Sequence, residues 1–149
     1  MSLTTKQFID KVKIGAIEGR KQHGILSSVS IAQAACESGW GTSTKGNNLF
    51  GIKANGWKGK TIVITTHEYI KGVYTQIKDT FRSYNSWNDS ISDHAAFLVQ
   101  NERYKNIVNN KNYIEVCHDL QKDGYSTSPT YAITLIGIIQ KYGLTRFDK

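Results

Sequence analysis

Glu37 is the residue of this sequence that is best placed to move a proton. Apolar residues before it occupy a broad face instead of alternating, which predicts a helix over Ser28–Ser38, capped by one of the two serines at its start. A carboxyl group in the last turn of that helix faces the negative end of the helix dipole, and its neighbours Cys36 and Trp40 solvate charge poorly. Both influences favour the protonated carboxyl group, so Glu37 is a candidate general acid.

Trp40 is a second candidate, because it stands between two glycines directly after the helix. Gly39 and Gly41 allow the positive φ angles that a close chain reversal needs. A tryptophan at this point is expected to face whatever occupies a cleft beside Glu37. The alternative is that Glu37 is an ordinary solvated residue and Trp40 a core residue, and neither side chain alone decides between the two.

Patterns along the chain predict a mostly helical domain with one β-hairpin. Strand-forming residues fill the segment 60–84, in which Ile70-Lys71-Gly72 supplies a turn. Apolar residues at helical spacing, with caps and glycine stops, mark the helices, and Thr4-Thr5-Lys6-Gln7 is typical of a capping box at the start of the first one. Besides the helix before Glu37, helices are expected between Thr4 and Gly19 or Gly24, from Ser86 or Asn88 to Leu98, from Asn112 to Lys122, and from the cap Ser128-Pro129 to Gly143.

Glu68 is the acidic residue of the first predicted strand and lies near its turn end. Because side chains alternate along a strand, Glu68 shares a face with Ile62, Ile64 and Thr66. A charge on an exposed strand also prevents pairing with other sheets, so the position alone allows a structural or a catalytic role.

The composition limits the class of protein. The chain has 149 residues, one proline and no low-complexity tract, which predicts a single domain over 1–149. A net charge of +7 attracts polyanions, yet no lysine or arginine run marks a nucleic-acid-binding arm. No stretch reaches the roughly 18 apolar residues of a membrane helix, and no signal peptide is visible. Cys36 and Cys117 are expected to be small buried residues, not a disulfide or metal ligands.

Several motifs resemble those of glycoside hydrolase family 73, the peptidoglycan-cleaving endo-β-N-acetylglucosaminidases of autolysins, flagellar and phage lysins. The motifs are AQAACESGWG, GNNLFGIKA, THEY, FRSYNSWNDSISDHAAFL and GYSTSPTYA, and together they extend over nearly the whole chain. A Glu-Ser pair in a helix also occurs in lytic transglycosylases, so the series of motifs carries the resemblance, not that pair alone.

The resemblance implies an α+β, lysozyme-like fold in which a mostly helical lobe and a small antiparallel hairpin lobe enclose a saccharide cleft. It implies hydrolysis of the β-1,4 bond between N-acetylglucosamine and N-acetylmuramic acid without a metal or cofactor, with Glu37 protonating the leaving oxygen. A second carboxylate that activates water and attack by the substrate's own acetamido group both remain open. The alternatives are a muramidase or lytic transglycosylase that uses Glu37 alone, and a wall-binding module without turnover.

The resemblance also assigns roles to residues. It favours Glu68 as the second carboxylate and Tyr131 as a functional tyrosine, while His67 and His94 are assigned to structure. The predicted catalytic residues are therefore Glu37, Glu68 and Tyr131, and the predicted substrate-binding residues are Trp40, Asn48, Phe50, Trp57 and Tyr125.

The expected partner is the glycan strand of bacterial peptidoglycan, bound by a monomer that neither binds nucleic acid nor inserts into a membrane. The expected location is extracellular or in the cell wall. Since no export route is visible, we expect an excised domain, a mature form with an added Met, or a phage-encoded enzyme.

Overall fold

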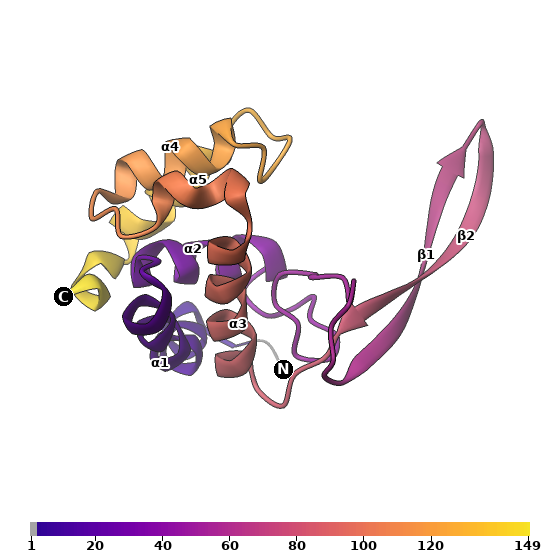
Figure 1. Cartoon of the computed structure of the whole chain (residues 1–149), viewed down its shortest axis with the longest axis horizontal. Helices are drawn as coiled ribbons and strands as arrows, with labels where there is room; N and C mark the ends of the chain where they lie inside the picture. Colours follow the sequence, from indigo (N-terminus) through magenta and orange to yellow (C-terminus); the bar gives the residue numbers. More distant parts are fainter. Residues whose placement is uncertain (1–2) are drawn as a thin grey trace.

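The computed structural model describes residues 3–149, which form a helical body and one projecting β-hairpin (Figure 1). This arrangement confirms the predicted α+β class. In chain order the elements are α1 (Thr5–His23), α2 (Ser27–Ser38), β1 (Thr61–Ile70), β2 (Val73–Arg82), α3 (Trp87–Gln100), η1 (Glu102–Ile107), α4 (Tyr113–Lys122), α5 (Tyr131–Lys141) and η2 (Leu144–Asp148).

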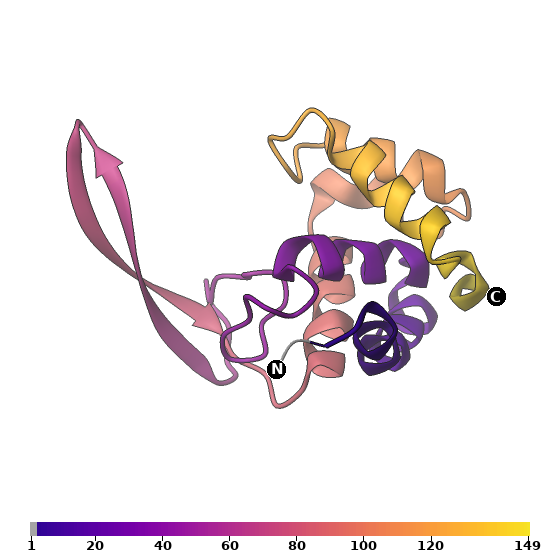
Figure 2. The ribbon, with the colours of Figure 1, turned by 180° about the vertical axis from the view of Figure 1, so that it is seen from behind.

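Helix α2 lies at the centre of the helical body, between α1 on one side and the α4 and α5 pair on the other (Figure 2). Every residue of this helix from Ser27 to Ala35 is buried. Because six of those nine residues are serine or alanine, neighbouring helices approach it closely. The helix that carries Glu37 is thus held from several sides.

Helices α1 and α3 cross at two glycines of α1. A Cβ atom on Gly15 would lie 2.4 Å from Ile91 Cγ2, and one on Gly19 would lie 2.9 Å from Ala95 Cβ. Both distances are shorter than atoms tolerate, so the absence of a side chain allows this contact.

The structure confirms two predicted caps and corrects two. Ser86 caps α3, since its hydroxyl accepts a hydrogen bond from the Asp89 N–H at 3.1 Å. The capping box of α1 forms as expected, since Thr4 and Gln7 exchange hydrogen bonds. The serines do not cap α2 with their side chains. Instead the carboxylate of Asp148 accepts hydrogen bonds from the Ser28 backbone N–H at 2.8 Å and the Ser28 hydroxyl at 2.6 Å. Helix α5 begins at Tyr131, later than the expected cap, because residues 129 and 130 form a turn.

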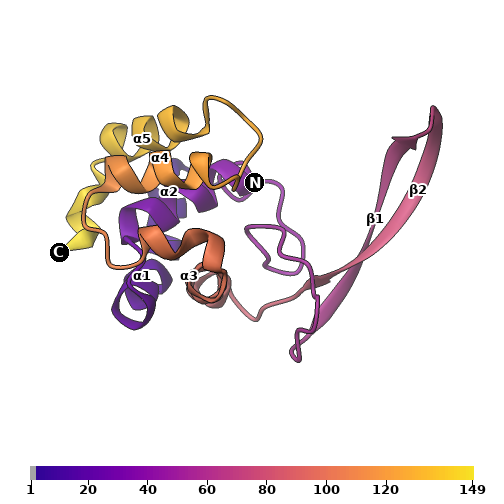
Figure 3. The same cartoon turned by 45° about the horizontal axis from the view of Figure 1, so that its top comes forward.

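The hairpin is a two-stranded antiparallel ribbon that extends away from the helices (Figure 3). Its register pairs Thr61 with Arg82 at the base and Ile70 with Val73 at the turn. The predicted turn is confirmed, with Lys71 and Gly72 at positive φ. Most side chains toward the tip are exposed, since no second layer covers the ribbon there.

Within residues 3–149, no helix is long and apolar enough to cross a membrane. Both cysteines are free thiols. Cys117 is buried as expected, whereas the prediction for Cys36 is wrong, because its position in the last turn of α2 leaves it exposed.

Candidate active site

Glu37 lies in the last turn of α2, on the wall of a cavity of about 470 Å³. The loop that follows the helix supplies one side of this cavity, and the base of the hairpin supplies Ile64 and Phe81. Glu37 is the carboxyl group among the lining residues that the structure describes. One acidic side chain therefore lines a cavity that lies between the helical body and the hairpin.

The helix ends directly beside Glu37 because three successive residues adopt left-handed backbone angles. Gly39, Trp40 and Gly41 have φ angles of 56°, 57° and 87°. The Trp40 N–H donates to the Ala35 carbonyl at 2.9 Å, and the Ser43 N–H donates to the Ser38 carbonyl at 3.0 Å. The chain reversal provides hydrogen-bond donors for carbonyl groups at the end of the helix, and it fixes the direction of the Glu37 side chain.

The Glu37 carboxylate has one buried partner in Tyr131. The Tyr131 hydroxyl donates to Glu37 Oε1 at 3.1 Å and accepts from Gln33 Nε2 at 3.1 Å. Partial desolvation by the surrounding chain raises the pKa of Glu37, and the hydrogen bond from Tyr131 opposes that shift. Burial, followed by the charge of Glu37, raises the pKa of Tyr131, so the phenol stays protonated and remains a donor.

A row of aromatic rings supports Tyr131 from behind. Tyr125 stacks on Tyr131 with centroids 5.6 Å apart, and its hydroxyl shares a 2.7 Å hydrogen bond with His94 Nε2. The fully buried His94 ring stacks on Phe50 at 3.6 Å. Burial lowers the pKa of His94 to about 3, so this imidazole is neutral at physiological pH. The row joins α3, α5 and the loop before the hairpin.

Phe50 separates the Glu37 cavity from a second one of about 480 Å³. Phe50 and Gly51 line both cavities, so the two are adjacent. Tyr125 and Phe97 give the second cavity aromatic walls, and Lys53 gives it a cation. The structure thus places Phe50 and Tyr125, two predicted binding residues, where a long ligand in the first cavity would continue.

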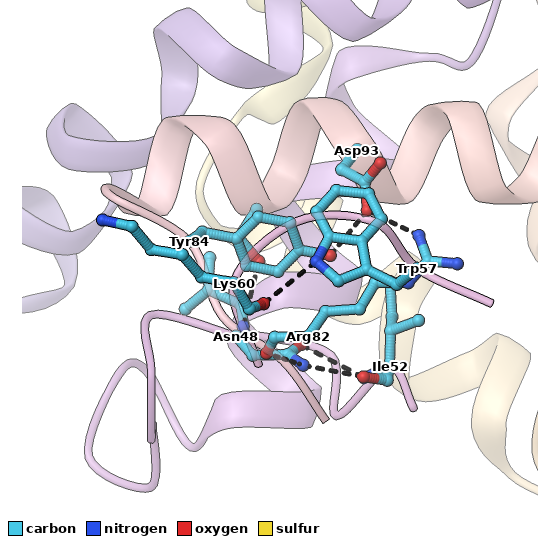
Figure 4. A network of polar contacts seen from close by, with 9 residues as sticks. Asn48, Ile52, Trp57, Lys60, Arg82, Tyr84 and Asp93 are labelled. Carbon is cyan, nitrogen blue, oxygen red and sulfur yellow. Dashed lines mark hydrogen bonds and ion pairs between the residues drawn. The ribbon is translucent and has the colours of Figure 1, made fainter. Parts of the chain in front are cut away.

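Asn48 lines the first cavity, but its amide is fully engaged with backbone groups (Figure 4). Its Nδ2 donates to the carbonyls of Ile52 and Arg82, both at 2.9 Å, and its Oδ1 accepts from the Ile52 N–H at 3.1 Å. The amide holds the loop to the hairpin base, so hydrogen bonding from Asn48 to a ligand is not supported.

The two predicted tryptophans lie away from the Glu37 cavity. Trp40 packs edge-on against Phe8 at 5.5 Å and against Tyr142 at 5.1 Å, so it joins the core and does not face the cleft. Trp57 donates from Nε1 to the Lys60 carbonyl at 3.0 Å and lies 4.7 Å from the Arg82 guanidinium (Figure 4). These contacts favour the core alternative for Trp40, and they indicate that Trp57 covers its own loop.

Glu68 also lies outside the lining of both cavities. It pairs with Thr75 in the outer half of the ribbon, on the strand face that Ile64 occupies. It lies four positions beyond Ile64, which corresponds to about 13 Å along a strand. The structure therefore does not bring Glu68 and Glu37 together in the same cavity.

Gln33 is a residue beside Glu37 that sequence reasoning missed, and the buried His94, which was assigned to structure, packs behind the site. Gln33 lies one helical turn before Glu37, the spacing that places two side chains on one helix face, and this signal was available. His94 carries no local signal, because its partners Phe50 and Tyr125 come from distant segments.

Comparison with known proteins defines the class. A family model for glucosaminidases, described as mannosyl-glycoprotein endo-beta-N-acetylglucosaminidase, matches residues 14–144. The chain belongs to this glucosaminidase family of glycoside hydrolases, which confirms the family that the motifs indicate.

Particular relatives are similar over almost the whole chain. The exo-glucosaminidase LytG of Bacillus subtilis is 37% identical over 95% of this chain and 53% of its own length. The peptidoglycan hydrolase FlgJ of Escherichia coli is 36% identical over 92% of this chain and 46% of its own length. The chain thus spans about half the length of these relatives. The catalytic domain of the autolysin Auto from Listeria monocytogenes superposes with a TM-score of 0.82 at 33% identity, covering 99% of this chain and 91% of that domain.

Proposed function

We propose that the protein is a peptidoglycan hydrolase that cleaves the β-1,4 bond between N-acetylglucosamine and N-acetylmuramic acid, on the reducing side of the glucosamine. The observation that carries this proposal is Glu37, a carboxyl group of raised pKa that a buried tyrosine holds on the wall of a cavity between two lobes. The names of the relatives, a glucosaminidase and a peptidoglycan hydrolase, support the choice of substrate. The site of action is then the bacterial cell wall, outside the cytoplasmic membrane.

In the proposed reaction Glu37 is the general acid. Its proton passes to the glycosidic oxygen while the bond from that oxygen to the glucosamine C1 breaks, and the bonding electrons leave with the oxygen. Positive charge develops at C1, and the carboxylate that remains at Glu37 stabilises it. The Tyr131 hydroxyl keeps that carboxylate oriented through its 3.1 Å hydrogen bond. A water molecule finally adds to C1 and gives up a proton.

The second carboxylate is proposed to be Glu68, acting as the base for that water. Its place in the outer ribbon, beyond the cavity lining, requires the ribbon to bend toward Glu37 when the glycan binds. Attack by the substrate's acetamido group is the alternative, since it needs no second carboxylate. Phe50 and Tyr125 are proposed to contact sugars that extend into the second cavity.

Product analysis tests the bond that is cut. Purified peptidoglycan is digested, the products are reduced with borohydride and their ends are identified by mass spectrometry. Reduced N-acetylglucosamine ends are expected, whereas reduced or anhydro muramic ends would replace the proposal with a muramidase or a lytic transglycosylase. The size distribution of early products separates internal cleavage from release at chain ends, a distinction on which the family description and the name of the Bacillus relative differ.

Replacement of each carboxylate tests the mechanism. Glu37→Gln is expected to lower kcat by about 10²- to 10⁴-fold, the usual contribution of a general acid, while the circular dichroism spectrum stays unchanged. Glu68→Gln is the discriminating variant. A comparable loss supports Glu68 as the base, and near-parental activity transfers that role to the acetamido group.

A further inference from the structure

The outer half of the hairpin carries an exposed aromatic cluster that none of the preceding roles uses. We define the aromatic cluster as His67, Tyr69 and Tyr74. The exposed fractions of Tyr69 and Tyr74 are 75% and 61%. The rings are nevertheless ordered against one another, since Tyr74 stacks on His67 at 5.0 Å with an interplanar angle of 6° and contacts Tyr69 at 5.1 Å. Solvent-facing rings that already pack together lose little conformational freedom when a ligand covers them.

The strand register separates charge between the two faces of the ribbon. Tyr69 pairs with Tyr74, and Lys78 is two pairs further down the same face, opposite Thr65. Within this paired ribbon the acidic residues, Glu68 and Asp79, both point to the other face, the one that also carries Ile64. The aromatic cluster therefore shares its face with a lysine and with no carboxylate among the strand residues that the structure describes.

These features fit a carbohydrate with anionic substituents. Tyrosine rings offer flat apolar faces that pack on the C–H faces of pyranoses, and their hydroxyls and the His67 nitrogens can bond sugar hydroxyls. Lys78 complements carboxylates such as those on muramic acid and its peptides.

We propose that the aromatic cluster binds a glycan strand of insoluble peptidoglycan, as a second contact apart from the Glu37 cavity. This inference rests on the proposed substrate. The base of the ribbon lines the cavity through Ile64, and Tyr69 lies five residues further out, about 16 Å along a strand. One domain would then contact a strand in the cavity and a second segment or strand of the wall at the hairpin.

The test measures binding to the wall without turnover. Glu37→Gln protein is mixed with peptidoglycan sacculi freed of teichoic acids by hydrofluoric acid, and the dissociation constant is obtained by pelleting. Adding Tyr69→Ala and Tyr74→Ala is expected to raise Kd about tenfold, given the usual contribution of aromatic contacts. Ile133→Ala is the matched control, because Ile133 is an exposed apolar residue, 67% accessible, on α5. It is expected to leave Kd unchanged.

A second readout separates this inference from the proposed function. In protein with Glu37 intact, the two tyrosine substitutions are expected to leave hydrolysis of short soluble glycan fragments unchanged and to slow lysis of sacculi. An unchanged Kd for sacculi overturns the inference, as does a loss of binding seen only when teichoic acids are present. It is also overturned if sedimentation shows that the tyrosines instead hold two copies of the chain together. Failure of the parental protein to cleave soluble fragments refutes the proposed function itself.

Discussion

Glu37 is subject to two opposing influences that a single substitution separates. Desolvation raises its pKa, and the hydrogen bond from Tyr131 stabilises the ionised form and so lowers it. Without the Tyr131 hydroxyl, nothing in this pair opposes the rise in the pKa of Glu37 that desolvation causes.

We therefore expect Tyr131→Phe to raise the pKa of Glu37. If Glu37 acts as an acid, the alkaline limb of the pH profile of kcat/KM moves to higher pH, while the maximal rate falls because the carboxyl group is less well oriented. The profile on soluble glycan fragments checks this expectation. A limb that stays in place or moves to lower pH would contradict it.

The same desolvation predicts a link between the charge of Glu37 and folding. Where a carboxyl group has a higher pKa in the folded state than in the unfolded state, its ionisation destabilises the fold. This loss of stability is absent below the unfolded pKa, about 4.3, and grows as the pH rises through the folded value. Glu37→Gln should therefore unfold at a slightly higher temperature than the parent at pH 7. At pH 3.5 the difference should vanish. Thermal unfolding at both pH values measures it, and a less stable variant at pH 7 would refute this account.

At the residue scale, sequence alone could predict what depends on neighbours along the chain. Glu37 at a helix end and the reversal after it are local features, and the structure contains both. The contacts that engage Trp40 and the Asn48 amide could not be predicted, because the partners Phe8, Tyr142 and Arg82 are remote in sequence. No spacing rule reveals which ring a tryptophan after a glycine will meet.

At the element scale, the crossing of α1 and α3 yields a paired prediction. Gly15→Ala improves helix propensity but forces a methyl group against Ile91 and the Asn88 carbonyl, 2.4 Å and 2.5 Å away. We expect it to destabilise the fold by about 1–3 kcal/mol through overpacking. Gly137 in α5 has no atom within 4 Å of a built Cβ, so Gly137→Ala should stabilise the fold by about 0.5–1 kcal/mol. Urea unfolding of both variants measures the change in the free energy of unfolding. An equal change in the two variants would show that helix propensity outweighs packing at Gly15.

The elements themselves were mostly predictable, but their caps were less so. Periodicity and turn residues locate the helices and the hairpin to within a few residues. The α1 capping box is local and therefore visible. The cap of α2 comes from Asp148, 120 residues away, and only the packing of η2 against α2 brings it there.

At the scale of the whole molecule, the hairpin and the helical body should differ in local stability. The ribbon lacks a covering layer in its outer half, whereas α2 is surrounded by helices. Isolated two-stranded ribbons are marginally stable in water. Amides of residues 65–78 are accordingly expected to exchange with deuterium much faster than those of α2. Mass spectrometry of exchanged peptides measures this, and equal protection would show that the ribbon folds as one unit with the body.

The fold class followed from sequence at this scale, and the motifs identified the family. The placement of the ribbon did not follow, because its orientation depends on base contacts such as Lys53 with Asp79 and Asn48 with Arg82 that join segments about 30 residues apart. For the same reason the separation of Glu68 from Glu37 was beyond sequence reasoning.

The solvent exposure of Glu37 determines how this side chain can be reprotonated. Its side chain is exposed on a cavity wall, so a proton that leaves it can return directly from bulk water or buffer. His94, by contrast, is sealed from solvent and neutral. In the proposed reaction the aromatic row behind Tyr131 therefore has no need to conduct protons, and Glu37 regains its proton from the solvent side after each cycle.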